Sequence, residues 1–178
     1  VRAAYRAIVD YGTELAKWQE PLMHFHQETT AAGYPSFFGG QSHAPFDILA
    51  DTLRGTKGII LDMYRQPEKL LKAIEKITPM NIACGLEGIN ITGTPIVFFA
   101  LHKGDDTFMS NAQYEKFYWP SLKKVMNALI NEGLICQMFA EGGYNTRLAV
   151  IKDDFPKGSV VCWFDQTDMA MAYKHLGY

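Results

Sequence analysis

Apolar side chains recur at intervals of three and four residues along the first part of the chain. This spacing predicts a long amphipathic helix over residues 1–29, which the proline at position 21 is expected to kink or restart. The Gly-Tyr-Pro run at 33–35 ends the pattern, and the Ser-Phe-Phe segment at 36–38 predicts a buried strand leading into a loop at 39–40. The apolar positions of the helix are Ala4, Ile8, Tyr11, Leu15, Trp18 and Leu22.

The second half of the chain alternates apolar runs with helical patterns. Three runs, at residues 95–100, 134–140 and 159–164, predict strands, the first of them buried on both sides. Continuous apolar runs of this kind are typical of parallel strands that are covered on both faces. Together with the segment at 36–38, the alternation therefore predicts a parallel α/β sheet of four strands.

Capping residues mark the expected ends of the helices. Residues 45–64 predict short helical pieces broken at Gly55 and Gly58, and Pro67-Glu68 predicts the start of another helix. Further capping signals predict a helix that begins at the capping box Ser110–Gln113, bends at Pro120 and stops at Gly133, and a final helix capped by Thr167.

The number of expected strands constrains the fold. A complete (β/α)₈ barrel needs about 250 residues, and only four strong strands are expected in these 178 residues. The chain is therefore either a small open α/β sheet or part of a larger barrel. Because the sequence begins within a helical pattern and stops where another strand is expected, we favour a partial TIM barrel, with residues 1–178 as a single domain.

Composition adds limits on partners and location. The net charge of −2 gives no reason to expect nucleic acid, and no apolar run reaches the roughly 18 residues that span a membrane. The three cysteines, Cys84, Cys136 and Cys162, are far apart, which favours a reducing cytoplasm. Cys136 and Cys162 lie in apolar runs, where buried and unreactive thiols are common.

Polar side chains follow the expected strands, where (β/α)₈ enzymes place their chemistry. These residues are His102, Glu141, Asp165 and the pair Asp47 and Asp51. Structural roles are the alternatives: Asp165 could cap a helix, Glu141 could bind backbone amides in its glycine-rich turn, and a lone histidine is often only hydrogen-bonded. Arg54 and Arg147 could pair with substrate carboxylates, although a solvated surface position is expected for each.

Four stretches together resemble the uroporphyrinogen decarboxylase superfamily, which also contains zinc-dependent cobalamin methyltransferases. Their order and spacing fit nearly the whole chain, and the resemblance implies the middle and later units of a (β/α)₈ barrel. The stretches are His43–Leu49 followed by Leu53-Arg54-Gly55, Phe108-Met109-Ser110 through Phe117–Pro120, Met138–Gly142, and Phe164–Asp168 with Leu176-Gly177.

Departures from the family patterns bear on the reaction. The methyltransferases carry a zinc-binding His-x-Cys where this chain has Phe139 and Glu141, and phenylalanine cannot bind zinc. The decarboxylases carry a tyrosine at the position of Asp51, which differs from aspartate in charge and in donor capacity. The first departure argues against methyl transfer, and the second against the decarboxylation of uroporphyrinogen itself.

The resemblance implies a cofactor-independent decarboxylase that acts on a tetrapyrrole or a related polycarboxylate. Asp165 and Asp51 are the candidates for stabilising positive charge, and Glu141 and His102 for proton transfer. The expected substrate-binding residues are Phe46, Asp47, Arg54 and Tyr144.

Two alternatives remain open: a corrinoid-dependent methyltransferase, the one case in which zinc is expected, and a non-catalytic protein that binds a small molecule. The resemblance also implies a cytoplasmic homodimer for the full-length protein, without nucleic acid or membrane partners.

Overall fold

The computed structural model describes residues 1–34 and 36–177, which form two units, Val1–Phe37 and Phe38–Tyr178. The first unit contains the helix α1 (Arg2–Ala31), which confirms the expected N-terminal helix and continues through Pro21 without a restart. None of its residues is buried within the structure. Among the described residues, no helix has the length and apolar character needed to cross a membrane. The interpretation of the whole chain as one domain stays a prediction.

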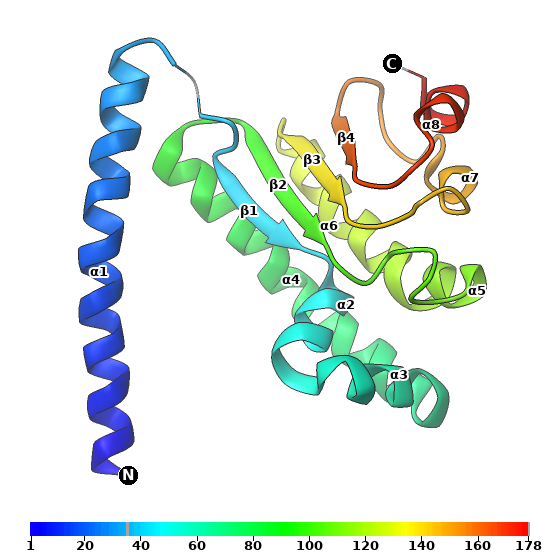
Figure 1. Cartoon of the computed structure of the whole chain (residues 1–178), viewed down its shortest axis with the longest axis horizontal. Coiled ribbons are helices and arrows are strands. Elements are labelled where there is room, and N and C mark those ends of the chain that lie inside the picture. The colour runs from blue at the N-terminus through cyan, green and yellow to red at the C-terminus, as the bar shows by residue number, and fades with distance from the viewer. Residues whose placement is uncertain (35, 178) are drawn as a thin grey trace. The chain divides into compact units, whose positions relative to one another are not determined.

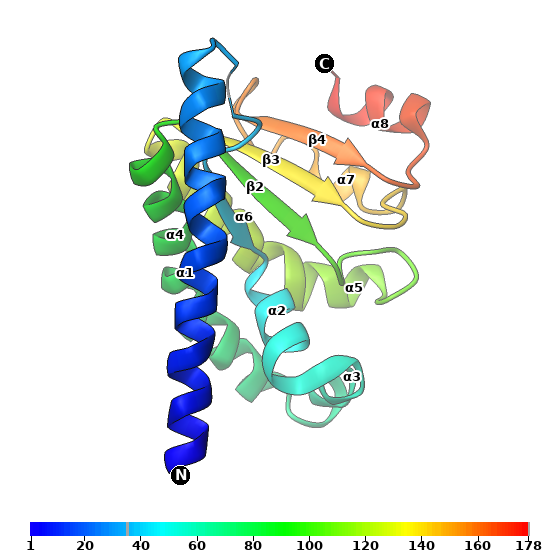
Figure 2. The same cartoon turned by 60° about the vertical axis from the view of Figure 1, so that its left-hand side comes forward.

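The second unit is built on a sheet of four parallel strands in the order β1-β2-β3-β4 (Figures 1 and 2). The strands are β1 (Gly40–His43), β2 (Ile96–Leu101), β3 (Ile135–Ala140) and β4 (Val160–Phe164). The prediction of a parallel α/β arrangement is confirmed, and the last three strands coincide with the apolar runs. Four parallel strands alternating with helices are what a partial (β/α)₈ barrel contains.

The position of β1 differs from the expected strand at residues 36–38. The strand consists of Gly-Gln-Ser-His at 40–43, which has no apolar pattern. Polar contacts with the helix α4 (Pro67–Thr92) hold it in place: Ser42 Oγ donates to the Asn81 carbonyl at 2.9 Å, and Asn81 Nδ2 donates to the His43 carbonyl at 2.7 Å. Tertiary contacts thus define this strand, and the local pattern could not reveal it.

Glycines allow β1 and α4 to pack in close contact. A Cβ atom at Gly88 would lie 2.5 Å from the Cα atom of Gly40, and a Cβ atom at Gly40 would lie 2.4 Å from the carbonyl oxygen of Gly85. Both distances are too short for a side chain. The backbones of the strand and the helix therefore touch directly, which glycine alone permits.

The segment between β1 and α4 folds into α2 (Pro45–Ile48), a π-helical turn η1 (Leu49–Arg54) and α3 (Gly55–Arg65). The expected break at Gly55 is confirmed, and this glycine has a φ of 66°. The second expected break is wrong, because Gly58 lies inside α3. The helix after β2 is also divided, into α5 (Asn111–Gln113), a π-helical turn η2 (Tyr114–Tyr118) and α6 (Trp119–Asn131).

Most of the expected helix ends are confirmed. In the capping box, Gln113 N donates to Ser110 Oγ at 3.3 Å, and Gly133 follows α6 with a φ of 84°. Pro120 lies in the first turn of α6, where a backbone N–H has no partner within the helix, so its missing N–H group costs no hydrogen bond. The cap of the last helix, α8 (Met169–Leu176), was expected at Thr167 and is instead Asp168. Thr167 Oγ instead accepts a hydrogen bond from Tyr144 N at 3.0 Å, in the loop after β3.

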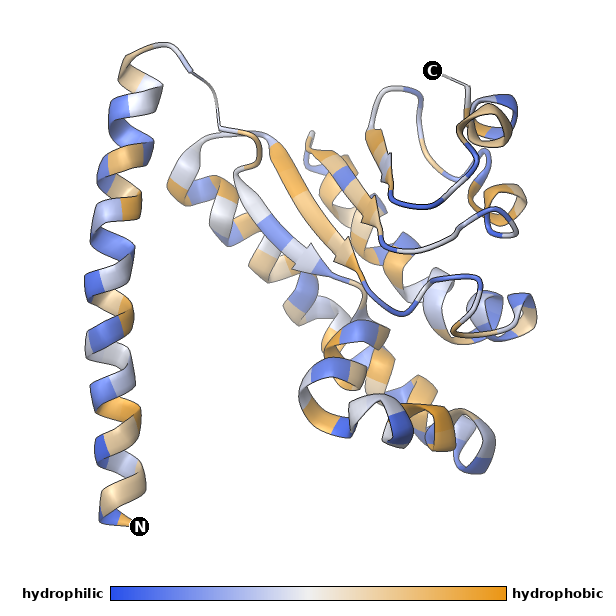
Figure 3. Cartoon of the chain, in the orientation of Figure 1, coloured by the Kyte–Doolittle hydropathy of each residue, from blue (hydrophilic) through white to orange (hydrophobic). Residues whose placement is uncertain are grey.

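One face of the sheet carries the core. The helices α4 and α6 pack on it, against β1 and β3 (Figures 1 and 3). The side chains of Val97, Phe99 and Leu101 in β2 are fully buried. The alternate residues of β2 are only half-buried, so the expectation of burial on both sides is wrong. In a closed barrel, side chains of the other strands fill that inner space.

Candidate active site

Each strand leads into a polar side chain at the same edge of the sheet. His43 is the last residue of β1, and His102, Glu141 and Asp165 directly follow β2, β3 and β4. Backbone hydrogen bonds continue beyond the strands, from Glu141 N to the Leu101 carbonyl and from Asp165 N to the Ala140 carbonyl, both at 3.3 Å. The prediction that Glu141 and Asp165 follow neighbouring parallel strands is therefore confirmed.

His102 lies between two carboxylates. Its Nδ1 atom is 2.6 Å from Asp51 Oδ2, and its Nε2 atom is 3.9 Å from Glu141 Oε1. Lys103 Nζ is 3.1 Å from the other oxygen of Asp51. We call these four residues the His102 cluster. Asp51 belongs to the π-helical turn η1, a kind of turn that occurs frequently at functional sites.

Electrostatics fix the charge of Asp51 and the tautomer of His102. Burial raises the pKa of Asp51, but hydrogen bonds from His102 and Lys103 outweigh it and hold the pKa below its usual value. Asp51 is therefore ionised at neutral pH and can only accept a hydrogen bond. It follows that Nδ1 of His102 carries a proton, and that Nε2 is the ring atom that faces Glu141 and solvent.

His43 lies near His102, and no separate role is predicted for it from the sequence. Its ring centroid is 6.4 Å from that of His102. Burial and the neighbouring His102 lower the pKa of His43, which favours the neutral imidazole. The sequence patterns place His43 only at the start of a family stretch, because they predict the preceding strand at 36–38. Its place directly before Ala44-Pro45, at a strand end, is the signal that could have found it.

Asp47 lies behind the His102 cluster and is 1% exposed. Its carboxylate accepts hydrogen bonds from His102 N at 3.0 Å, Lys103 N at 3.1 Å and the Tyr118 hydroxyl at 2.6 Å. Burial raises the pKa of Asp47 to about 6, although these hydrogen bonds oppose the change. Asp47 was expected to bind substrate, and the structure turns its carboxylate toward the backbone that follows β2.

An open cavity of about 400 Å³ lies beside the His102 cluster. It brings together side chains from the loops after β2 and β3 and from the start of α3, and it combines both signs of charge with one aromatic ring. The residues that line it are Thr56, His102, Lys103, Asp105, Thr107, Phe108, Glu141 and Gly142. Asp165 is held next to this set, because its Oδ2 atom accepts a hydrogen bond from Gly142 N at 3.2 Å.

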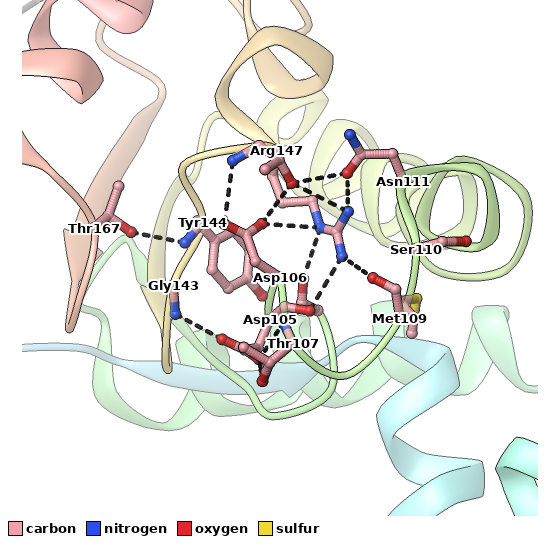
Figure 4. Close-up of polar contacts among 12 residues, drawn as sticks. Asp105, Asp106, Thr107, Met109, Ser110, Asn111, Gly143, Tyr144, Arg147 and Thr167 are labelled. Atoms are coloured by element: carbon pink, nitrogen blue, oxygen red, sulfur yellow. Dashed lines mark hydrogen bonds and ion pairs between the residues drawn. The ribbon is translucent and has the colours of Figure 1, made fainter.

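A second polar group joins the loops after β2 and β3 (Figure 4). Arg147, expected at the surface, is instead 1% exposed. Its guanidinium donates to the carbonyls of Gly104 at 3.1 Å, Asp105 at 3.1 Å and Met109 at 2.5 Å, and to the Asn111 side chain. We call Arg147 with Asp106, Asn111 and Thr146 the Arg147 cluster. The bound carbonyls are about forty residues away in the sequence, so no local signal indicated this burial.

Asp105 ties the same two loops together from the cavity side. Its Oδ2 atom accepts a hydrogen bond from Gly143 N at 2.6 Å, and its Oδ1 atom accepts one from Thr107 N at 2.7 Å. Gly142 has a φ of 78°, and a Cβ atom there would lie 2.2 Å from Asp105 Oδ2. The glycine-rich turn after Glu141 is thus shaped by its contact with Asp105.

The remaining expected substrate-binding residues lie apart from the cavity. Phe46 and Tyr144 are fully buried in the core. The Arg54 side chain is 48% exposed and binds both carboxylate oxygens of Asp62, at 2.6 and 2.9 Å. We therefore give packing roles to the two aromatic residues, and only Arg54 keeps a charged group near solvent.

No group of three or more His, Cys, Asp and Glu side chains suited to a metal ion occurs within residues 1–34 and 36–177. At the positions where zinc ligands occur in the methyltransferases, Phe139 stacks on Phe98 at 6.4 Å between ring centroids and Glu141 faces His102. Burial raises the pKa of Cys136 to about 12 and that of Cys162 to about 11, so both thiols stay protonated, as expected of unreactive cysteines.

Parallel strands whose carboxyl ends collect a histidine, acids and a lysine around a cavity define the class: an α/β protein built like part of a TIM-barrel enzyme. Comparison with protein families places it more closely. The family model described as Uroporphyrinogen decarboxylase (URO-D) matches residues 30–176, which is most of the chain. The chain belongs to this family, whose fold is a TIM barrel. No curated protein matches it closely enough to add a named relative.

Proposed function

We propose that this chain forms part of the active site of a carboxy-lyase that removes carboxyl groups from a tetrapyrrole or a related polycarboxylate without a cofactor. The observation that carries the proposal is the placement of His102, with Asp51 at Nδ1 and Glu141 facing Nε2 beside a cavity. Membership of the family supports the reaction class. The proposal includes a homodimeric intact protein.

His102 is the proposed proton donor. Asp51 holds the ring by its Nδ1–H group. A proton taken up at Nε2 from solvent through Glu141 makes the ring an imidazolium, which gives this proton to an electron-rich ring carbon of the substrate. The C–CO₂ bond then breaks, its electron pair moves toward the positive ring, and carbon dioxide leaves. A second proton, supplied by solvent, adds to the exocyclic carbon, while the ring carbon returns the first proton to Nε2 of His102. One proton is therefore consumed for each carbon dioxide released.

The acids of the site suit the charge that develops in this reaction. The protonated ring is positive, and Asp51 and Asp165 are carboxylates at the same edge of the sheet that could stabilise it. Glu141, whose side chain is 44% exposed, can exchange protons between Nε2 and solvent. Lys103, which lines the cavity, is the cation nearest to carboxylates of the substrate that do not react.

The test is anaerobic incubation of the intact protein with uroporphyrinogen and other polycarboxylate porphyrinogens, followed by chromatography that separates products by their number of carboxyl groups. We expect His102→Asn to lower the rate by roughly 100- to 10,000-fold, the usual contribution of a general acid. His24→Asn is the matched control and should keep the full rate, because His24 lies exposed on α1 beside Glu28. Absence of any product from the unmodified protein, or equal rates in both variants, would contradict the proposal.

A further inference from the structure

We infer that Asp47 is a positioning residue, which holds His102 in its reactive place by binding the backbone where β2 ends. This inference rests on the function proposed above, because it explains how the proposed proton donor is kept in register with Asp51 and Glu141. The geometry that carries it is the convergence of three donors on one buried carboxylate.

The three donors come from distant parts of the sequence. His102 N and Lys103 N reach Asp47 at 3.0 and 3.1 Å, and they are the first two amides beyond the last residue of β2. The third donor is the hydroxyl of Tyr118, at 2.6 Å, from the turn η2. Bonds of this kind, from backbone amides to a buried carboxylate, are among the stronger hydrogen bonds in proteins.

A single segment thus controls both the backbone and the side chain of His102. Asp47 binds the amide of His102, while Asp51, four residues further along the same segment, binds its ring. Any shift of Asp47 would move the backbone of His102 relative to its ring partner. The Nε2 atom, 3.9 Å from Glu141, would then lose its direction toward the cavity.

Tyr118 keeps the carboxylate of Asp47 in one orientation. The tyrosine is fully buried, and burial together with the neighbouring Asp47 raises its pKa well above the usual value. Its hydroxyl therefore stays a donor across the physiological range. Removal of this hydroxyl would leave the two backbone bonds to Asp47 in place, which makes Tyr118→Phe a milder version of a change at Asp47.

The experiment compares Asp47→Asn with Asp154→Asn in the intact protein. Asparagine keeps the size of aspartate but presents one oxygen and one NH₂ group, so it cannot accept from all three donors. Asp154 is the matched control, because its carboxylate also accepts a hydrogen bond, from Trp119 Nε1 at 2.6 Å, outside the site. We expect Asp47→Asn to lower kcat roughly 10- to 100-fold at an unchanged KM, the effect of a misplaced group, and Asp154→Asn to leave kcat unchanged.

Two further measurements separate positioning from a general loss of structure. Ring ¹⁵N chemical shifts of His102 should report a single Nδ1–H tautomer in the unmodified protein and a mixture in Asp47→Asn. In the background of His102→Ala, Asp47→Asn should cause no further loss of activity, because Asp47 acts through His102. If Asp47→Asn fails to fold, Tyr118→Phe serves for the same comparison, with a smaller change in the same direction.

The outcomes distinguish the failure of this inference from the failure of the proposed function. Unchanged His102 ring shifts in folded Asp47→Asn would overturn the positioning role, whatever the reaction is. Additive losses in the double variant would overturn it as well. An altered tautomer in a protein that decarboxylates no porphyrinogen would support the positioning of His102 and reject the proposed reaction.

Discussion

The Arg147 cluster and the His102 cluster join the same two loops but differ in their access to solvent. Arg147 is 1% exposed and donates to three backbone carbonyls and a side chain (Figure 4). His102 and Asp51 each keep 33% of the side chain exposed and lie beside the cavity. Location in the loops after β2 and β3 therefore does not separate a buried polar cluster from one that lines a cavity, whereas burial does.

The physical reason is the cost of removing charge from water. A buried guanidinium is stable only when acceptors surround it, and once it is surrounded its donors are no longer available to a ligand. A histidine at the edge of a cavity keeps one ring nitrogen open to solvent and can exchange protons there. The comparison predicts that substitutions in the first cluster affect stability, and that substitutions in the second affect activity.

The largest expected effect on stability is that of Arg147→Met. This change leaves three backbone carbonyls, two of them in buried hydrogen bonds, and the partly buried Asp106 without their cation, and we expect the free energy of unfolding to fall by about 3–5 kcal/mol. Chemical denaturation of the intact protein measures it. Arg54→Met is the matched control, since Arg54 is half exposed and its loss should have far less effect. Equal losses in the two variants would remove the distinction between the clusters.

The next effect is a pH dependence with opposite signs at Asp47 and Asp51. The pKa of Asp47 rises from 3.8 to about 6 on folding, so the folded protein holds this proton more tightly than the unfolded chain. The contribution of Asp47 to stability is therefore present in full below pH 4 and is lost as the pH rises to about 6, by about 3 kcal/mol. The pKa of Asp51 is lowered, so its contribution is present above pH 4 and is lost in acid.

Denaturation between pH 3 and 7 of the unmodified protein and of both Asp→Asn variants tests these signs. The stability advantage of the unmodified protein over Asp47→Asn should shrink from pH 4 to 6. Its advantage over Asp51→Asn should grow from pH 3 to 4 and then stay constant. If both stability differences changed with pH in the same direction, burial would not distinguish the two carboxylates.

The smallest expected effect on stability is that of His102→Asn. The ring is one-third exposed, and its loss should change the free energy of unfolding by less than about 1 kcal/mol. The same variant should lose most of its activity, as proposed above. Thermal and chemical unfolding measured beside the rate decide the point: a destabilisation as large as that of Arg147→Met would make His102 a structural residue.

The sequence predicted the elements whose signals are local. The apolar runs of β2, β3 and β4 and the capping box at Ser110 were recognisable because strand burial and helix caps act within a few residues. The strand β1 was misplaced because its Gly-Gln-Ser-His sequence is held by α4 and not by its own pattern.

In the candidate site too, the sequence predicted the residues with local signals and missed the contacts between distant residues. His102, Glu141 and Asp165 were found because residues that directly follow strands share one edge of a parallel sheet. The partnership of Asp51 with His102, the burial of Arg147 and the backbone contacts of Asp47 join residues that are 36 to 56 positions apart. Single-sequence patterns contain no information about such pairs.

The alignment of the side chains at the cavity depends on a direct contact far from it, between Gly40 of β1 and Gly88 of α4. A methyl group added at either glycine would force the strand and the helix apart. Because β1 ends in His43 and continues into the segment that carries Asp47 and Asp51, this displacement would be transmitted along the strand to the acids that hold His102. The glycines near the C-terminal end of α4 are thus part of what aligns the groups at the cavity.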